Sequence, residues 1–158
     1  MSPETIRPST QLKSFIYGSM YADNVSQLVT IPGPDTFTQV PAGLTAGLCV
    51  GVTFQNNKEL KITIAGTYWI SWSMSPVAAT SSNKECEGTI MINGNTQANF
   101  TAHSLVSPGG NNRPITFSGN NPIVLAVNDL ISMAIKNHTD GADITIEHVT
   151  LTALRIGD

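Results

Sequence analysis

The sequence predicts a single all-β domain built as a sandwich of two sheets. Its clearest segment, residues 66–75, alternates apolar and polar side chains with the two-residue period of a half-buried strand. Similar short segments recur along the chain, separated by turn-forming residues at the spacing of a β-sandwich. No segment keeps an apolar period of 3.6 residues for three turns, so we expect no helix longer than about two turns.

The composition is that of one domain with an unusually uncharged surface. The chain has 158 residues, of which 41% are hydrophobic, so it can bury one substantial core but has little material for a second. Only 12% of the residues are charged, about half of the usual share of about 25%. Low charge is typical of an exterior that is partly buried against copies of the chain or a larger scaffold, although secreted β-sandwiches share it.

Charge and hydropathy argue against nucleic acid and a membrane as partners. The formal net charge is −3 and Lys and Arg do not cluster, which argues against nucleic-acid binding. No segment approaches the length of a membrane span, and residues 1–13 lack the apolar core of an export signal, so we expect a soluble chain without a signal of its own. The two cysteines, Cys49 and Cys86, lie in apolar segments, which favours buried free thiols over a disulfide.

The first half of the chain contains an irregular start and five expected strands. Residues 1–13 carry two prolines and no periodic pattern, so we interpret them as an arm that either lies across a neighbouring subunit or is a solvated tail. The single domain then occupies residues 14–158. Its first five strands are expected at residues 15–21, 27–31, 36–40, 47–55 and 60–64, with turns at Pro32-Gly33-Pro34-Asp35, Pro41 and Asn56-Asn57-Lys58.

The strand at residues 66–75 has one face for the core and one exceptional aromatic. Tyr68, Ile70 and Trp72 share a face with Met74, and we assign them to the core. Trp69 lies on the opposite face among serines and threonines. It is either a lone exposed aromatic or an anchor for another chain, and the low charge of the protein favours the anchor.

The second half of the chain is predicted from its turns. The dipeptide Asn93-Gly94 is typical of a type I′ hairpin, so a strand is expected on each side of it. Further strands are expected at residues 100–106, 115–117, 122–127 and 130–137, with an exposed loop at 107–112. In the last strand, residues 144–156, the apolar parity changes near Glu147 and His148. Either a β-bulge switches the faces, or both faces are buried.

Several of these segments resemble one known family. The run Leu60-x5-Gly66-x-Tyr68-x-Ile70-x-Trp72 resembles the signature strand of C1q/TNF-like jelly rolls, with Leu and Ile in place of two aromatics. Residues 124–131 resemble the apolar strand, Gly-Asp turn and next strand of that family, with Asn128 where glycine is usual, and residues 144–156 resemble its central last strand. Over residues 48–156 the resemblance implies a jelly-roll β-sandwich of about 8–10 strands and a homotrimer around an axis through the inner sheet.

The start of the domain, Tyr17-Gly18-Ser19-Met20-Tyr21, and the lack of a signal peptide or collagen stalk are similar to the C1q/TNF-like domains of tailed-phage structural proteins. The resemblance implies a non-enzymatic virion protein made in the host cytoplasm. Our primary hypothesis is a trimeric capsid decoration (cement) protein bound to the lattice of the major capsid protein. The alternatives are a receptor-binding or tip module of a tail fibre or baseplate, and a secreted C1q-like binding module.

The expected contact residues lie on two strands. We assign Trp69, Val149 and Leu151 to subunit contacts. His148 is expected either as a polar layer on the three-fold axis or as a half-buried histidine whose hydrogen bonds are satisfied.

No residue pattern supports catalysis or a cofactor. The three histidines, His103, His138 and His148, lie in no metal-ligand spacing, and the chain has no Gly-x-Ser-x-Gly motif. Asp140-Gly-Ala-Asp143 is interpreted as a turn rather than a calcium loop. The glycosylation sequons at Asn24, Asn99 and Asn137 are attributed to chance. We therefore assign no catalytic residue, metal or cofactor.

Overall fold

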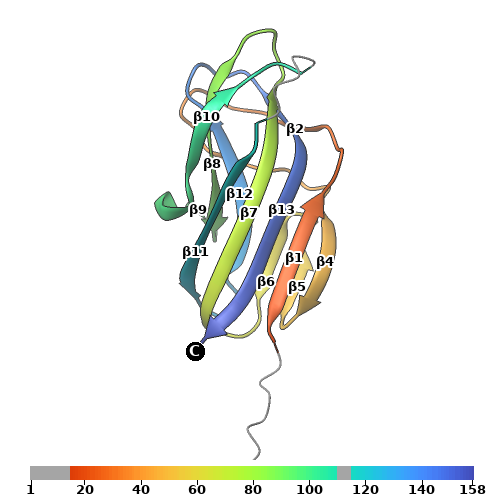
Figure 1. The fold of residues 1–158 in the computed structure, drawn as a ribbon, viewed down its shortest axis with the longest axis vertical. Helices are drawn as coiled ribbons and strands as arrows, with labels where there is room; N and C mark the ends of the chain where they lie inside the picture. The colour runs from red at the N-terminus through yellow and green to blue at the C-terminus, as the bar shows by residue number, and fades with distance from the viewer. Residues whose placement is uncertain (1–14, 110–114) are drawn as a thin grey trace, which may run out of the picture.

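The computed structural model describes residues 15–109 and 115–158, which form a sandwich of two antiparallel sheets (Figure 1). The expected arm, residues 1–13, and part of the expected loop 107–112 lie outside the described residues. The described part contains thirteen strands, three of which have only two or three residues. Its only helical element is the 3-10 turn η1 (Ala98–Phe100), and no helix in it has the length and hydropathy needed to cross a membrane.

One sheet, sheet A, has the strand order β11-β7-β13-β1-β4, and β2 also pairs with β13. The last strand of the chain is therefore central in sheet A, between β7 and β1, as Figure 1 shows. Its strands are β1 (Tyr17–Ala22), β2 (Gln27–Val29), β4 (Thr45–Val50), β7 (Gly66–Ala78), β11 (Phe117–Leu125) and β13 (Ile144–Gly157).

The other sheet, sheet B, has the order β10-β8-β12-β6-β5, with β3 beside β12 and β9 beside β8. Its central strand, β12, lies between β8 and β6, which come from earlier parts of the chain. The two sheets therefore form the predicted jelly roll rather than a simple meander. Its strands are β3 (Thr38–Gln39), β5 (Val52–Gln55), β6 (Glu59–Ile62), β8 (Lys84–Ile92), β9 (Asn95–Thr96), β10 (Ala102–Val106) and β12 (Leu130–Asn137).

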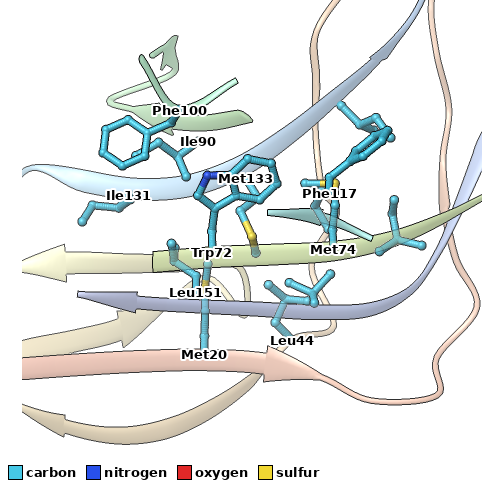
Figure 2. Packing of buried hydrophobic residues seen from close by; sticks show 14 of the residues in the cluster. Met20, Leu44, Trp72, Met74, Ile90, Phe100, Phe117, Ile131, Met133 and Leu151 are labelled. Atoms are coloured by element: carbon cyan, nitrogen blue, oxygen red, sulfur yellow. The ribbon is translucent and has the colours of Figure 1, made fainter. Parts of the chain in front are cut away.

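The core lies between the sheets and is filled by alternate residues of each strand. Tyr68, Ile70, Trp72 and Met74 of β7 are all buried, as their parity predicts. Figure 2 shows Trp72 projecting from β7 towards Met133 on the facing sheet. Burial of each side chain of this size contributes about 1.5–3 kcal/mol of transfer free energy, so this one strand accounts for a large share of the hydrophobic stabilisation.

Two strand predictions are corrected by the structure. Residues 47–55 form two strands, because Gly51 adopts a φ of +66° and the chain crosses there from β4 in sheet A to β5 in sheet B. The apolar alternation continues across this crossing, but Leu48 and Val50 are exposed on β4 whereas Val52 is buried on β5. Conversely, the strands expected at 115–117 and 122–127 form one strand, β11, because it lies at the edge of sheet A, where Pro122 needs no N–H donor.

Three finer predictions are confirmed. The register between β13 and β7 shifts between Ile146 and His148, which is the expected bulge. Asn93 and Gly94 have φ values of +52° and +79°, as a type I′ turn between β8 and β9 requires. Both cysteines are free thiols, of which Cys86 is buried as expected and Cys49 is only partly buried.

Close packing between the sheets predicts that Gly88 in β8 cannot carry a side chain. A Cβ there would lie 2.8 Å from Cδ2 of Phe117 and 3.3 Å from Cη2 of Trp72. We expect Gly88→Ala to lower the free energy of unfolding, measured by urea denaturation, by about 1–3 kcal/mol. The matched control is Gly33→Ala, whose Cβ would meet no atom within 4 Å and should change it by no more than about 0.5 kcal/mol. Equal effects of the two substitutions would show that the interior is not packed as described.

Candidate interaction surface

The outer face of sheet A carries an in-register row of apolar residues. Pro122 of β11 pairs with Trp69 of β7, Trp69 with Leu154 of β13, Leu154 with Tyr17 of β1, and Tyr17 with Val50 of β4. Because paired residues point to the same side of a sheet, these five side chains lie across its whole width. Ile156, Val124 and Leu48 extend the row on the same face, and the last two are each 77% exposed. We call these eight residues the apolar belt: Tyr17, Leu48, Val50, Trp69, Pro122, Val124, Leu154 and Ile156.

Next to the apolar belt, the same face is lined by hydroxyl groups. Ser71 of β7 pairs with Thr152 of β13, and Ser73 pairs with Thr150. The hydroxyls of Ser73 and Thr150 are 2.8 Å apart and share a hydrogen bond. These side chains are neutral, so the centre of sheet A offers hydrogen-bonding groups without the desolvation cost of a buried charge.

His148 lies beyond the hydroxyl groups, at the bulge in β13. Its Nδ1 is 2.8 Å from Oδ1 of Asp23 and 3.3 Å from the backbone N of Asn24. Nδ1 can accept the Asn24 N–H only when it carries no proton, and it can donate to Asp23 only when it carries one. The side chain of His148 is about half exposed at the margin of the face. Its hydrogen-bond partner, Asp23 or Asn24, depends on whether Nδ1 carries the proton.

The structure separates the expected contact residues into two groups. Tyr68, Ile70 and Trp72 lie in the core, whereas Trp69 is 40% exposed on the outer face of sheet A. Val149 and Leu151 are buried in the core of the same chain, so their assignment to subunit contacts is wrong. The bulge at Glu147 is the physical reason, because one extra residue turns both side chains inward.

Sequence reasoning missed most of the apolar belt. After the bulge, the outward residues of β13 are Thr150, Thr152, Leu154 and Ile156, and the apolar pair among them was a signal that the parity already contained. Local alternation does not reveal Tyr17, Val50 and Pro122 as members of the belt, because each joins it through pairing with a strand that is distant in the sequence.

A second cluster, on sheet B, is ionic rather than apolar. His138 contacts Oδ1 of Asp35 through Nδ1 and lies 3.1 Å from Oε2 of Glu87 through Nε2, while Lys136 lies 3.0 Å from the same Glu87 oxygen. These contacts attach the β2–β3 loop to the sheet. Within residues 15–109 and 115–158, no three His, Cys, Asp or Glu side chains are arranged to hold a metal ion.

Comparison with known proteins supports the fold. No family model matches the sequence, and no curated protein matches it. Solved structures do. The Eiger TNF of S. frugiperda is similar with a TM-score of 0.57 and 13% identity, over 92% of this chain and 95% of that chain. Murine APRIL is similar with a TM-score of 0.52 and 12% identity, over 89% of this chain and 99% of that chain.

The globular domain of the zebrafish complement 1qA protein is similar with a TM-score of 0.53 and 9% identity, over 89% of this chain and 97% of that chain. Because all three identities are low, these similarities establish the architecture alone. The chain has the C1q/TNF-like jelly-roll fold that the sequence resemblance implied.

Two leucines of β13 test the division between core and outer face. Leu151 is fully buried, whereas Leu154 is 36% exposed in the apolar belt. We expect Leu151→Ala to lower the free energy of unfolding of the chain by about 2–5 kcal/mol. Leu154→Ala should cost much less when urea denaturation is followed at the lowest concentration that tryptophan fluorescence allows, where association contributes little. The opposite order of the two costs would mean that the parity after the bulge is misassigned.

Proposed function

We propose that the chain is a non-enzymatic interaction module that assembles into a homotrimer through the apolar belt of sheet A. The observation that carries this proposal is the in-register apolar row that includes Trp69, which leaves an aromatic side chain 40% exposed. Contiguous exposed apolar surface of this kind marks an interaction site. Trp is also the residue type most often found at the energetic centre of protein interfaces.

The charge distribution supports burial of this face. The chain has 8 basic and 11 acidic residues, or 19 charged residues in all, and none of them belongs to the apolar belt. Arg155, which lies between Leu154 and Ile156 in the sequence, has its charge engaged elsewhere: its Nε donates to the backbone oxygen of Ala65, 3.0 Å away, and its Nη2 lies 2.7 Å from Asp158. A partner that covers the belt therefore does not have to bury an unpaired charge.

The extent of the apolar belt favours a closed ring. A cyclic trimer needs two different, complementary patches on each subunit, because every contact is heterologous. The belt reaches both edges of sheet A, with Pro122 and Val124 on β11 and Leu48 and Val50 on β4. One edge of a subunit can thus contact the middle of the next sheet, and three such contacts hide Trp69. This agrees with the three-fold assembly that the resemblance to C1q/TNF-like domains implies.

We further infer that the trimer is a virion structural protein that decorates the head of a tailed phage by binding the major capsid protein lattice. The sequence resemblance to phage domains of this fold supports this role, as does the low charge. The loops β6–β7 and β11–β12 also contribute: they expose Ile64 and Val127 at the end of the sandwich where β1 begins (Figure 1). The backbone N–H of Asn128 donates to the backbone carbonyl oxygen of Ile62 at 2.8 Å, so the two loops lie side by side.

The mechanism of such a protein is mass action rather than chemistry. A trimer that binds the assembled lattice, but not free capsid subunits, stabilises the lattice by about 2.7 kcal/mol per site when its free concentration is about 100 times Kd. Three subunits that bind together multiply modest individual contacts, since the second and third contacts form at a high effective concentration. Many weak apolar contacts are therefore enough to reinforce a shell.

Substitution of Trp69 in the belt tests the trimer. We expect Trp69→Glu to remain folded by circular dichroism but to raise the trimer dissociation constant at least about 30-fold, the loss of a contact of about 2 kcal/mol. The matched control is Leu105→Glu, because Leu105 is 55% exposed on β10 of sheet B, outside the belt. Native mass spectrometry of both variants over a dilution series gives the result. Unchanged association of Trp69→Glu, or equal dissociation of both variants, would contradict the proposal.

The location of the chain in a particle tests the decoration role separately. In a reconstruction of virions that carry an affinity-labelled chain, we expect trimer-shaped density repeated over the head lattice. Density restricted to the tail or baseplate tip would instead support the receptor-binding alternative. Recovery of the labelled chain only in the culture medium, outside particles, would support the secreted module. Either result rejects decoration without affecting the trimer.

A further inference from the structure

A buried lysine lies at the end of the sandwich opposite the Ile64 and Val127 loops. Lys84 is the first residue of β8, and its side chain is buried although it carries an amine. β12 lies beside β8, and the last residue of β12, Asn137, is fully buried. Asp140 follows in the loop between β12 and β13. Burial of a lysine ammonium costs desolvation free energy unless partners satisfy its charge and its N–H groups.

One carboxylate bridges the lysine amine and the asparagine amide. Lys84 Nζ lies 2.6 Å from Oδ2 of Asp140, and Nδ2 of Asn137 donates to Oδ1 of the same carboxylate at 2.9 Å. The amine of Lys84 also donates to the hydroxyl of Ser82 at 2.9 Å. The carboxylate is therefore in contact with both nitrogen atoms and can move a proton from one to the other.

The carbonyl of the Asn137 side chain is also polarised. Its Oδ1 accepts the backbone N–H of Thr139 at 2.9 Å and that of Asp140 at 3.3 Å. Two backbone donors on one carbonyl oxygen form the arrangement that stabilises negative charge in acyl transfer. Asp140 thus contacts both the Lys84 amine and the Asn137 amide nitrogen, while two backbone donors contact the Asn137 carbonyl oxygen.

We propose that Lys84 and Asn137 become joined by an intramolecular isopeptide bond, with Asp140 as the catalytic proton carrier. Nζ of Lys84 forms a bond to Cγ of Asn137, and the bond between Cγ and Nδ2 breaks. Of the three protons on the lysine ammonium, one stays on the new amide. The other two leave with the asparagine nitrogen as ammonium. The reaction needs no oxidant, reductant or second substrate.

The protonation states at this end define the first proton transfer. The hydrogen bond from Lys84 is the largest cause that lowers the pKa of Asp140, so its carboxylate is ionised at neutral pH and must take one proton from the lysine ammonium before the amine can attack. Burial raises the pKa of the nearby Cys86 to about 12, so the thiol stays neutral and does not compete as a nucleophile.

The bond would have a structural purpose that is independent of the trimer. It would tie the start of β8 to the end of β12, two neighbouring strands of sheet B. A covalent link between positions far apart in the chain restricts the unfolded ensemble, as a disulfide does, but it cannot be reduced. This is a sensible reinforcement for a chain whose two cysteines are unpaired.

The mass of the intact chain tests the bond directly. The purified full-length protein is expected to be lighter than its sequence requires by one ammonia molecule, under denaturing conditions. The matched variant Lys84→Arg keeps the positive charge beside Asp140 but has no nucleophilic amine, because the guanidinium stays protonated. It is expected to have its full calculated mass, as is Asp140→Asn. Tandem mass spectrometry of the tryptic digest should identify one branched peptide that joins Lys84 to Asn137.

Three results would overturn the proposal. The first is a full calculated mass for the native chain. The second is loss of ammonia that persists in Lys84→Arg, since a succinimide at Asn93-Gly94 loses the same mass without the lysine. The third is loss of one water molecule, which would join Lys84 to Asp140 instead. The branched peptide is sought in the protein without substitutions, so the test does not depend on whether a variant folds.

Discussion

The pairing of β7 with β13 is the interaction on which the rest of the structure depends. These two strands form the centre of sheet A through twelve paired positions, and each contributes every second side chain to the core. Because the period of a strand is two residues, the register that puts Trp72 and Leu151 inside also puts Trp69 and Leu154 outside. The core and the apolar belt are therefore two consequences of one register, and neither can change without the other.

A single extra residue makes this register compatible with the sequence. Ile144 and Ile146 point inward before Glu147, and Val149 and Leu151 point inward after it. Without the bulge, one half of β13 would direct its large apolar side chains to solvent. The bulge also brings His148 to the outer face, beside Asp23. This irregularity thus allows β13 to fill the core from Ile144 to Ala153 and to contribute to the belt as well.

Much of the fold could be predicted from local patterns. The alternation in β7, the positive-φ turn at Asn93-Gly94 and the bulge in β13 all arise from neighbouring residues, and the sequence contains them directly. The crossing at Gly51 was missed because apolar alternation is the same on both sides of a change of sheet. The belt was only partly visible, through Trp69, because Pro122, Tyr17 and Val50 meet it by pairing over long distances. The contacts of Lys84 with Asn137 and Asp140 depend in the same way on the register of β8 with β12.

The central claim is that the register of sheet A creates a surface which three copies of the chain bury together. Sedimentation equilibrium of the unmodified protein at micromolar concentration tests it most directly. The account predicts one species with three times the mass of a single chain. A well-folded, all-β species with the mass of one chain at every concentration would contradict it.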